Sequence, residues 1–344
     1  MGSEVVSDLT ASGFPLPDDA EAALLGLPAA AGEVAGARPM TLRAVPHLIW
    51  WAGRRDELLA WCRRTDQHPE SVWETSWALP DHTLSLAAAA AVVGVLNVTP
   101  DSFSDGGQFS TLAAQIRGVR EMFQQGALLV DVGGESTRPG HVPVDPDTEW
   151  ARLEPLLEAL TPAELGRISL DTRHGTIARR AAGMGVAVIN DVSGRPDAPM
   201  RDVLADARTA YIYMYNRAEP FLRGTFRLGA MLREMDAALY GLSLTLPDGL
   251  ARVAVDPGLG FAYGMDENVT VVRHLGLFRL FDRPLLVGGS RKRFVGRITG
   301  REVGERDAAG TALAALLRVK GADLVRTHAV REAVDALRMA EAIG

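Results

Sequence analysis

From Val92 to the end of the chain, short apolar runs alternate with longer stretches in which apolar residues recur three and four positions apart. The runs are rich in β-branched residues and predict strands, whereas the longer stretches predict amphipathic helices. Eight strands are expected, at residues 92–98, 127–132, 167–171, 187–190, 209–214, 253–256, 284–288 and 323–327. Helices are expected after them, for instance at 111–125, 172–184, 228–242 and 307–320. Alternating strands and helices are typical of a parallel α/β fold, and eight such units favour a closed (β/α)8 TIM barrel.

An open, doubly wound sheet is the alternative architecture. A dinucleotide-binding sheet of that kind usually carries Gly-x-Gly-x-x-Gly after its first strand. No such motif follows the first predicted strand of this chain, so the closed barrel remains the better interpretation.

Residues 1–80 differ in composition from the remainder of the chain. Residues 40–51 are apolar like a strand, and residues 56–64 have the pattern of a short amphipathic helix. A turn at 79–84 between short strands would suit a lid over the bottom of the barrel. We therefore expect an accessory segment of unknown role at 1–80 and the barrel domain at 81–344. Five of the six tryptophans lie in the accessory segment, namely Trp50, Trp51, Trp61, Trp73 and Trp77. A tryptophan patch packed on the barrel is the simpler interpretation of this segment, and a contact with a partner is the alternative.

Net charge, the cysteine count and the apolar runs indicate which partners and which cellular compartment to expect. The formal net charge of −7 gives no broad positive field, so nucleic acid is not expected as a partner. The single cysteine, Cys62, excludes an internal disulfide and suits the cytoplasm. The N-terminus lacks the pattern of a secretory signal, and the longest apolar run, 84–96, is shorter than the roughly 20 residues of a membrane span. No membrane partner is expected.

Polar side chains are predicted at the carboxyl ends of the strands, where barrel enzymes place their chemistry. Asp171, Asn190 and Asp256 would offer carboxylate and amide groups to a small heterocycle with several N–H donors and acceptors, and Lys292 would add a donor. Further residues that close or follow strands are Asn97, Asp131, Met214, Ser290, Arg291, Arg326 and His328.

Charged groups after the last two predicted strands favour an anionic ligand. Arg291, Arg326 and His328 occupy the region where many barrels bind phosphate. The histidines His68, His82 and His174 have no metal-ligand spacing with Cys, Asp or Glu, so the sequence gives no indication of a zinc site.

Seven ordered segments give the chain a specific resemblance to a known family. They read VLNVTPDSFSDGG at 95–107, DVGGESTRPG at 131–140, SLDT at 169–172, INDV at 189–192, DPGLGF at 256–261, SRK at 290–292 and RTH at 326–328. Over about residues 80–344 the chain resembles the dihydropteroate synthases, which join a pterin methyl diphosphate to p-aminobenzoate in folate synthesis. Residues 1–80 fall outside the resemblance.

The resemblance implies a role for each matching residue. Pterin binding is implied for Asp171, Asn190, Met214, Asp256, Phe261 and Lys292, and diphosphate binding for Asn97, Arg326 and His328. Binding of p-aminobenzoate is implied for Thr137, Arg138, Pro139, Phe261 and Ser290. Asn97 would also bind the Mg2+ cofactor, and Lys292, Asp101, Arg326 and His328 would be catalytic. A homodimer is expected from the resemblance as well.

The implied reaction is a substitution at the pterin methylene carbon. Diphosphate leaves, and the aromatic amine attacks the cation-like centre that results. Mg2+, Arg326 and His328 would stabilise negative charge on the leaving group, and the acidic pterin pocket would favour positive charge in the ring. The reaction needs no covalent protein nucleophile.

Three positions depart from the family pattern. Tyr263 stands where the family commonly has lysine, Tyr215-Asn216 where it often has His-Met, and Ala329 where aspartate often follows the last histidine. A pterin-binding paralogue with weak or altered activity is therefore an alternative. A pterin-dependent methyltransferase, a second alternative, would not need Ser290, Arg291 and Lys292.

Overall fold

A computed structural model gives the structure of this chain. It describes the backbone of strands at 22–28, 38–40 and 48–54, and residues 76–86, 89–99, 109–136, 143–206, 209–217, 226–261 and 263–343 with their side chains. The chain divides into two compact units. One comprises residues 76–220, 251–275 and 284–344, and the other comprises residues 1–75, 221–250 and 276–283.

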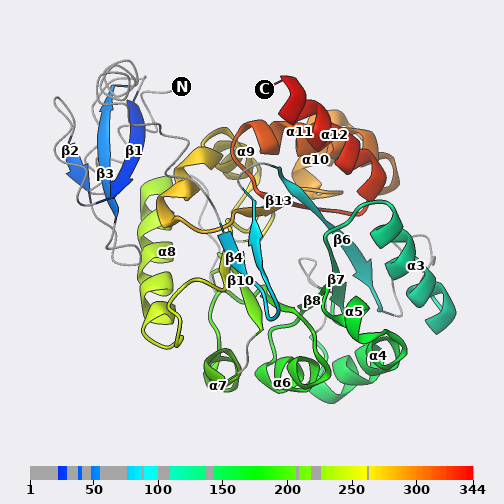
Figure 1. Cartoon of the computed structure of the whole chain (residues 1–344). Helices are drawn as coiled ribbons and strands as arrows, with labels where there is room; N and C mark the ends of the chain where they lie inside the picture. Colours follow the sequence, from blue (N-terminus) through cyan, green and yellow to red (C-terminus); the bar gives the residue numbers. More distant parts are fainter. Residues whose placement is uncertain are drawn as a thin grey trace. The chain divides into compact units, whose positions relative to one another are not determined.

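The first unit is built around an eight-stranded parallel sheet (Figure 1). Its strands lie in the order β11-β10-β9-β8-β7-β6-β13-β12. An isolated parallel bridge between Val255 and Leu285 and a 2.8 Å hydrogen bond from Val255 N to Pro284 O join the two end strands, so the sheet closes on itself. The strands are β6 (Ala91–Asn97), β7 (Leu129–Gly133), β8 (Ile168–Asp171), β9 (Val188–Asp191), β10 (Ala210–Met214), β11 (Val253–Asp256), β12 (Leu286–Gly288) and β13 (Leu324–Thr327). The prediction of a (β/α)8 barrel is confirmed.

Helices follow the strands around the barrel (Figure 1). They are α3 (Leu112–Gln124), α4 (Pro146–Ala159), α5 (Pro162–Leu165), α6 (Gly175–Met184), α7 (Ala198–Asp206), α9 (Met265–Arg273), α10 (Arg293–Thr299), α11 (Asp307–Val319) and α12 (Val330–Ile343), with the 3-10 helix η5 (Val303–Glu305) before α11. Local sequence fixes their ends. Thr111 caps α3 by accepting a hydrogen bond from Ala114 N, and Asp145 caps α4, which has Pro146 in its first turn. These helices fall close to the predicted ranges.

A short hairpin fills the bottom of the barrel. Strands β4 (Ser76–Ala78) and β5 (Thr83–Ser85) pair antiparallel, as the turn at 79–84 predicted. The indole of Trp77 is fully buried, and its Nε1 donates a 2.9 Å hydrogen bond to Arg252 O. Trp77 packs with residues at the start or middle of the barrel strands, including Val93, Leu129, Val188, Ala210, Ala254, Leu286 and Leu324. The hairpin therefore serves as the lid over the amino-terminal end of the barrel, and Trp77 belongs to the barrel core.

The second unit contains a three-stranded antiparallel sheet in the order β1-β3-β2 and the helix α8 (Leu228–Ser243). The strands are β1 (Ala22–Pro28), β2 (Arg38–Met40) and β3 (Leu48–Arg54), and the 3-10 helix η4 (Leu275–Phe281) reaches from the first unit into the second. The prediction of one strand at 40–51 is wrong, because Met40 pairs with Trp50 across two antiparallel strands. Residues 40–51 are apolar both before and after the chain reverses its direction. The apolar pattern therefore predicts extended backbone but does not show where one strand ends and the next begins.

Other predictions for the N-terminal segment are not tested. The helix expected at 56–64 lies outside the described residues, and the division at residue 80 stays a prediction. Among the described residues, no helix has both the length and the apolar character needed to cross a bilayer.

The buried hairpin makes a testable contribution to stability. We expect Trp77→Ala to lower the free energy of unfolding by about 3–5 kcal/mol, because it leaves a cavity under the barrel and removes the buried hydrogen bond from the indole to Arg252 O. Urea unfolding followed by circular dichroism measures the change. His82→Ala, at an exposed position of the same turn, is the matched control and should change stability by less than about 0.5 kcal/mol. Equal effects of the two substitutions would show that the hairpin is not part of the core.

Candidate functional site

A buried ionic network crosses the carboxyl-terminal half of the barrel and is centred on Asp131 of β7. Its Oδ1 accepts a 2.6 Å hydrogen bond from Ser169 Oγ of β8. Its Oδ2 accepts hydrogen bonds from Asn190 Nδ2 of β9 at 2.9 Å and from Arg326 Nη1 of β13 at 2.8 Å. All four side chains are buried. A buried charge must be paired and hydrogen-bonded. Arg326 pairs the charge of Asp131, and Ser169 and Asn190 donate further hydrogen bonds to it.

Asp171, at the end of β8, lies next to this network. Its Oδ2 is 3.9 Å from Arg326 Nη1, whereas its buried Oδ1 has no hydrogen-bond partner among the described residues. Burial raises the pKa of Asp171 well above its ordinary value, and the charge of Asp131 adds to that rise. A ligand that donates N–H groups to Asp171 would favour its ionised form.

Asn190 and Asp256 extend the same acidic surface. Because Asn190 Nδ2 is held by Asp131, the amide orientation is fixed, and Oδ1 is left without a partner among the described residues. Asp256 Oδ1 accepts a 2.7 Å hydrogen bond from Gly258 N, and burial raises the pKa of Asp256. Gly258 has φ 73°, and a Cβ there would meet Tyr215 O at 2.1 Å, so this turn requires glycine. Three acceptor groups thus stand at the carboxyl ends of β8, β9 and β11.

Lys292 provides the basic side of the site. It precedes α10, and its Nζ lies 4.2 Å from the centroid of the Phe261 ring. A Cβ on Gly260 would lie 3.0 Å from Lys292 Cδ, so glycine leaves room for the lysine stem. Burial and the nearby Arg326 guanidinium lower the pKa of Lys292 to about 7, although Asp256 and Asp171 act in the opposite direction. A substantial fraction of Lys292 is therefore neutral at physiological pH.

Arg326 and His328 lie at the end of β13. Burial acts to lower the pKa of Arg326, but the carboxylates of Asp131, Asp171 and Asp256 outweigh it, so that its pKa is raised and it stays charged. His328 Nδ1 lies 3.0 Å from Ser290 Oγ, which also accepts a 3.3 Å hydrogen bond from His328 N. The structure thus brings Ser290 and His328 together.

Arg291, also predicted near the anion, is held by an ion pair. Its guanidinium forms a two-point ion pair with Asp307 at the start of α11, with both N–O distances at 2.8 Å. Asp307 was not considered in the sequence interpretation, which could not show a partner 16 residues away. The ion pair fixes the position of the Arg291 guanidinium, and its place in the anion site stays a prediction.

The remaining predicted residues fall into two groups. Asn97 closes β6, and its Oδ1 and Asp171 Cβ lie 3.7 and 3.6 Å from the position of a Cβ on Gly133, so Asn97 and Asp171 are neighbours. Met214 closes β10 and is fully buried, with its Cγ next to Gly258. Asp101, Thr137, Arg138 and Pro139 lie outside the described residues.

The unusual Tyr263 has a defined structural role. It is buried, and its hydroxyl donates a hydrogen bond to Pro257 O, one residue beyond Asp256. Burial and the charge of Asp256 raise the pKa of Tyr263 well above its ordinary value. Asn268 Oδ1 accepts a 2.7 Å hydrogen bond from Gly260 N, which fastens the same turn. Tyr263 is therefore a neutral brace for the loop after β11.

One known protein family matches most of the barrel. A family model described as pterin binding enzyme matches residues 93–328, more than half of the chain. The chain belongs to this family.

The more particular resemblance is to dihydropteroate synthases. The chain is 37% identical to the dihydropteroate synthase of Bacillus subtilis (strain 168), over 76% of this chain and 90% of that protein. It is 36% identical to the folate synthesis bifunctional protein of Arabidopsis thaliana, of which it spans 58%. A solved dihydropteroate synthase of Xanthomonas albilineans with 4-aminobenzoic acid matches with a TM-score of 0.71 at 33% identity, over 78% of this chain and 98% of that chain. The resemblance predicted from the sequence is confirmed.

The lowered pKa of Lys292 can be measured directly, because Lys292 and Lys320 are the two lysines of the chain. We expect acylation of Lys292 by a small reagent to increase with pH through a midpoint near 7, since the neutral amine is the nucleophile. Mass spectrometry follows the two lysines separately, with Lys320 as internal comparison. A Lys292 midpoint near the ordinary value of about 10.4 would contradict the electrostatic description.

Proposed function

We propose that this chain catalyses the dihydropteroate synthase reaction, in which 6-hydroxymethyl-7,8-dihydropterin diphosphate and p-aminobenzoate give 7,8-dihydropteroate and diphosphate. The observation that carries the proposal is the set of unmatched acceptors at Asp171 and Asn190, held in place by the Asp131–Arg326 ion pair. Buried polar atoms without partners are costly, and a ligand with converging N–H groups would satisfy them. The named relatives are dihydropteroate synthases, which supports the same conclusion.

The pterin would bind through its polar edge. Its aminopyrimidinone ring presents N–H groups, which suit Asp171 Oδ1 and Asn190 Oδ1, with Asp256 as a further acceptor. Lys292 would donate to a ring oxygen or nitrogen, and Met214 and Phe261 would form the apolar walls. This assignment uses the open acceptor atoms of Asp171 and Asn190.

The diphosphate would bind near Arg326, His328 and Asn97. Arg326 uses Nη1 for Asp131, so the other N–H groups of its guanidinium can reach an anion. Asn97 contributes a neutral amide oxygen beside Asp171, which is a suitable donor for Mg2+. One protein oxygen is enough for this ion, because Mg2+ keeps waters and takes substrate oxygens as its other ligands. When bound, Mg2+ would supply positive charge to the diphosphate.

The protein's contribution to the reaction is electrostatic. The bond between the methylene carbon and the diphosphate oxygen breaks, the amine nitrogen bonds to that carbon, and the amine then gives one proton to solvent. Arg326 and His328 would stabilise the negative charge of the departing diphosphate, and the carboxylates of Asp171 and Asp256 would stabilise positive charge on the pterin. In this proposal the carboxylates would act on the pterin, and Arg326 and His328 would act on the leaving group.

The acceptor amine would approach along Phe261 and Ser290. Ser290 is held by His328, which would place the p-aminobenzoate site next to the diphosphate site. Thr137, Arg138 and Pro139 would complete it, and Asp101 and Lys292 complete the proposed catalytic group with Arg326 and His328.

We also propose that the protein acts as a cytoplasmic homodimer. Large apolar side chains on α11 and α12 are exposed, namely Leu316 at 55%, Val319 at 64%, Met339 at 58% and Ile343 at 76%. Exposed apolar groups gathered on neighbouring helices are a common feature of subunit interfaces. The single cysteine suits a reducing compartment.

A pterin-binding paralogue with altered activity is the second candidate. The observation in its favour is Tyr263, which braces the loop after β11 with a neutral group where the family commonly has a cation. The contact between Ser290 and His328 favours the synthase over a pterin-dependent methyltransferase, because a methyltransferase would not need Ser290.

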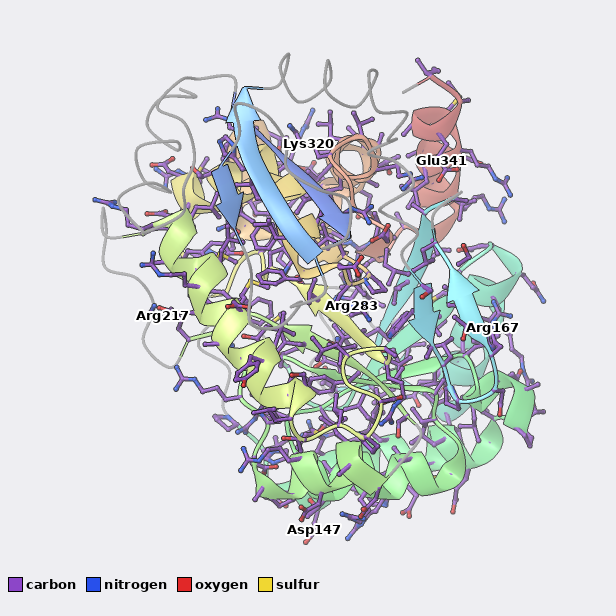
Figure 2. All side chains as sticks on the ribbon, turned by 60° about the vertical axis from the view of Figure 1, so that its left-hand side comes forward. Asp147, Arg167, Arg217, Arg283, Lys320 and Glu341 are labelled. Atoms are coloured by element: carbon purple, nitrogen blue, oxygen red, sulfur yellow. The ribbon has the colours of Figure 1, made fainter. Side chains whose placement is uncertain are left out.

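The direct test is diphosphate release from the pterin diphosphate with Mg2+, with and without p-aminobenzoate. We expect release that depends on p-aminobenzoate and forms dihydropteroate. Asp171→Asn should raise the KM for the pterin substrate about 10- to 100-fold, because it weakens a buried hydrogen bond to a charged group worth about 1.5–3 kcal/mol. Asp147→Asn is the control, since its side chain is 91% exposed (Figure 2).

The outcomes separate the two candidates. Pterin binding without diphosphate release would favour the paralogue. An unchanged KM in Asp171→Asn would remove Asp171 from the pterin site, and an equal change in Asp147→Asn would point to a general effect of charge.

A further inference from the structure

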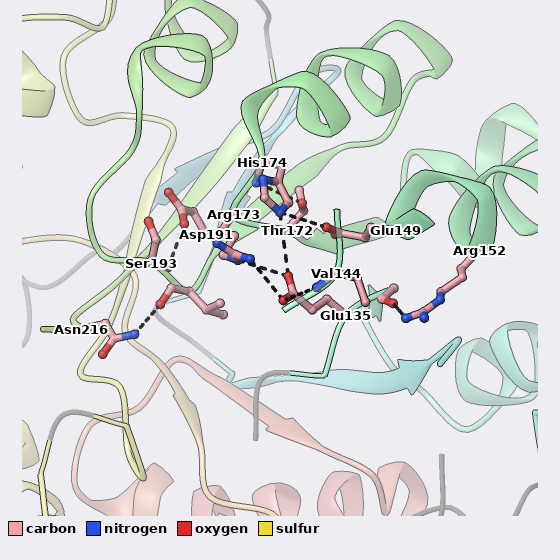
Figure 3. Close-up of polar contacts among 12 residues, drawn as sticks. Glu135, Val144, Glu149, Arg152, Thr172, Arg173, His174, Asp191, Ser193 and Asn216 are labelled. Carbon is pink, nitrogen blue, oxygen red and sulfur yellow. Dashed lines mark hydrogen bonds and ion pairs between the residues drawn. The ribbon is translucent and has the colours of Figure 1, made fainter. Parts of the chain in front are cut away.

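A second cluster of polar side chains is formed by two glutamates and a histidine from the segments after β7 and β8 and from α4. Glu135 follows β7, Glu149 lies in α4, and His174 precedes α6. Figure 3 shows the three side chains pointing toward one another. His174 Nε2 is 3.7 Å from Glu149 Oε2 and 3.9 Å from Glu135 Oε2.

The cluster contains polar atoms that the described residues leave unsatisfied. Glu149 is fully buried, and neither of its carboxylate oxygens has a hydrogen-bond partner of ordinary geometry there, although Thr172 lies near enough to favour its ionised form. His174 Nε2 is also buried and without such a partner in the described part of the chain. Each unsatisfied buried group costs about 1–3 kcal/mol, and an unpaired charge costs more. A bound cation would remove this cost.

We propose that Glu135, Glu149 and His174 bind one Zn2+ ion. One donor atom from each residue lies within 4.8 Å of the other two. Two ligands of one zinc ion are about 4 Å apart at most, because each lies about 2 Å from the metal. Both histidine–carboxylate distances already meet that limit, and a small rotation of a carboxylate brings the third pair within it.

The chemistry of the donors selects the metal. One imidazole nitrogen and two carboxylate oxygens suit zinc, whereas Mg2+ and Ca2+ prefer oxygen alone. Burial lowers the pKa of His174, which keeps the imidazole neutral and able to coordinate. The ligands also differ from the position proposed for Mg2+, where the protein offers the single amide oxygen of Asn97.

Arg173 supports the site from one side. Its Nε and Nη2 donate to the Glu135 carboxylate at 3.1 and 3.2 Å, which fixes the orientation of that side chain (Figure 3). Its positive charge opposes a second cation, but the side chain is 38% exposed, so water screens that repulsion.

The proposed ion has a structural role in the barrel. It would join the segment after β7 to α4 and to the loop after β8, which directly follows Asp171. Glu135 precedes the residues proposed to bind p-aminobenzoate, so the ion would anchor one end of that segment. The proposal concerns metal binding and does not depend on the proposed reaction.

The test is equilibrium binding of Zn2+ to the chelator-treated full-length protein, with Mg2+ in excess to occupy other oxygen sites. We expect one zinc per chain by calorimetry and metal analysis. Glu149→Gln and His174→Gln should weaken binding more than about 100-fold, beyond the 10- to 100-fold cost of losing a supporting residue. His82→Gln, at an exposed position, should bind like the unaltered protein.

The variants are designed to remain folded. Glutamine has the shape of the neutral form of Glu149, and burial already raises the pKa of Glu149 to about 7. His174 is partly exposed, which makes its replacement milder still. Circular dichroism checks the fold of each variant. The proposal is overturned if the unaltered protein binds no stoichiometric zinc, if both site variants bind it equally well, or if His82→Gln loses it.

Discussion

The buried ion pair between Asp131 and Arg326 is the interaction on which the rest of the site depends. It joins residues 195 positions apart across three neighbouring strands of the barrel. Neither charge could remain buried without the other, because the desolvation of a lone ion costs several kcal/mol. The pair therefore fixes the register in which the carboxyl ends of the strands present their side chains.

The electrostatics of the mouth follow from this pair. Asp131 holds the amide of Asn190, so that the amide oxygen is left for a ligand. Arg326 stands near Asp171 and Lys292, where it restrains the rise in the pKa of Asp171 and contributes to the lowered pKa of Lys292. The charged groups are thus held in place before any substrate binds. Such preorganised charge is the contribution that a substitution with a charged leaving group requires.

The barrel was predictable from the sequence because strand and helix periodicities alternate regularly. The residues at the strand ends were predictable for the same reason, since barrel geometry directs them to one mouth. Pairings between distant residues were not predictable. The ion pair between Arg291 and Asp307 is one such pairing, and the central position of Asp131 depends on contacts to three other strands.

Two further features explain the limits of sequence reasoning here. Glu149 lies in a helix among apolar residues, and only the folded chain brings it to His174 and Glu135. The strand expected at 40–51 is divided between β2 and β3, because apolar composition does not record a chain reversal. Periodicity therefore predicts elements, and three-dimensional contacts decide which polar residues meet.

The most direct test of the account is a crystal structure of this protein with 7,8-dihydropteroate bound. We expect the pterin ring at the carboxyl end of the barrel, with its N–H groups on Asp171 and Asn190 and with Asp131 still paired to Arg326. A pterin bound elsewhere, or a complex in which the Asp131–Arg326 pair is broken, would contradict the account.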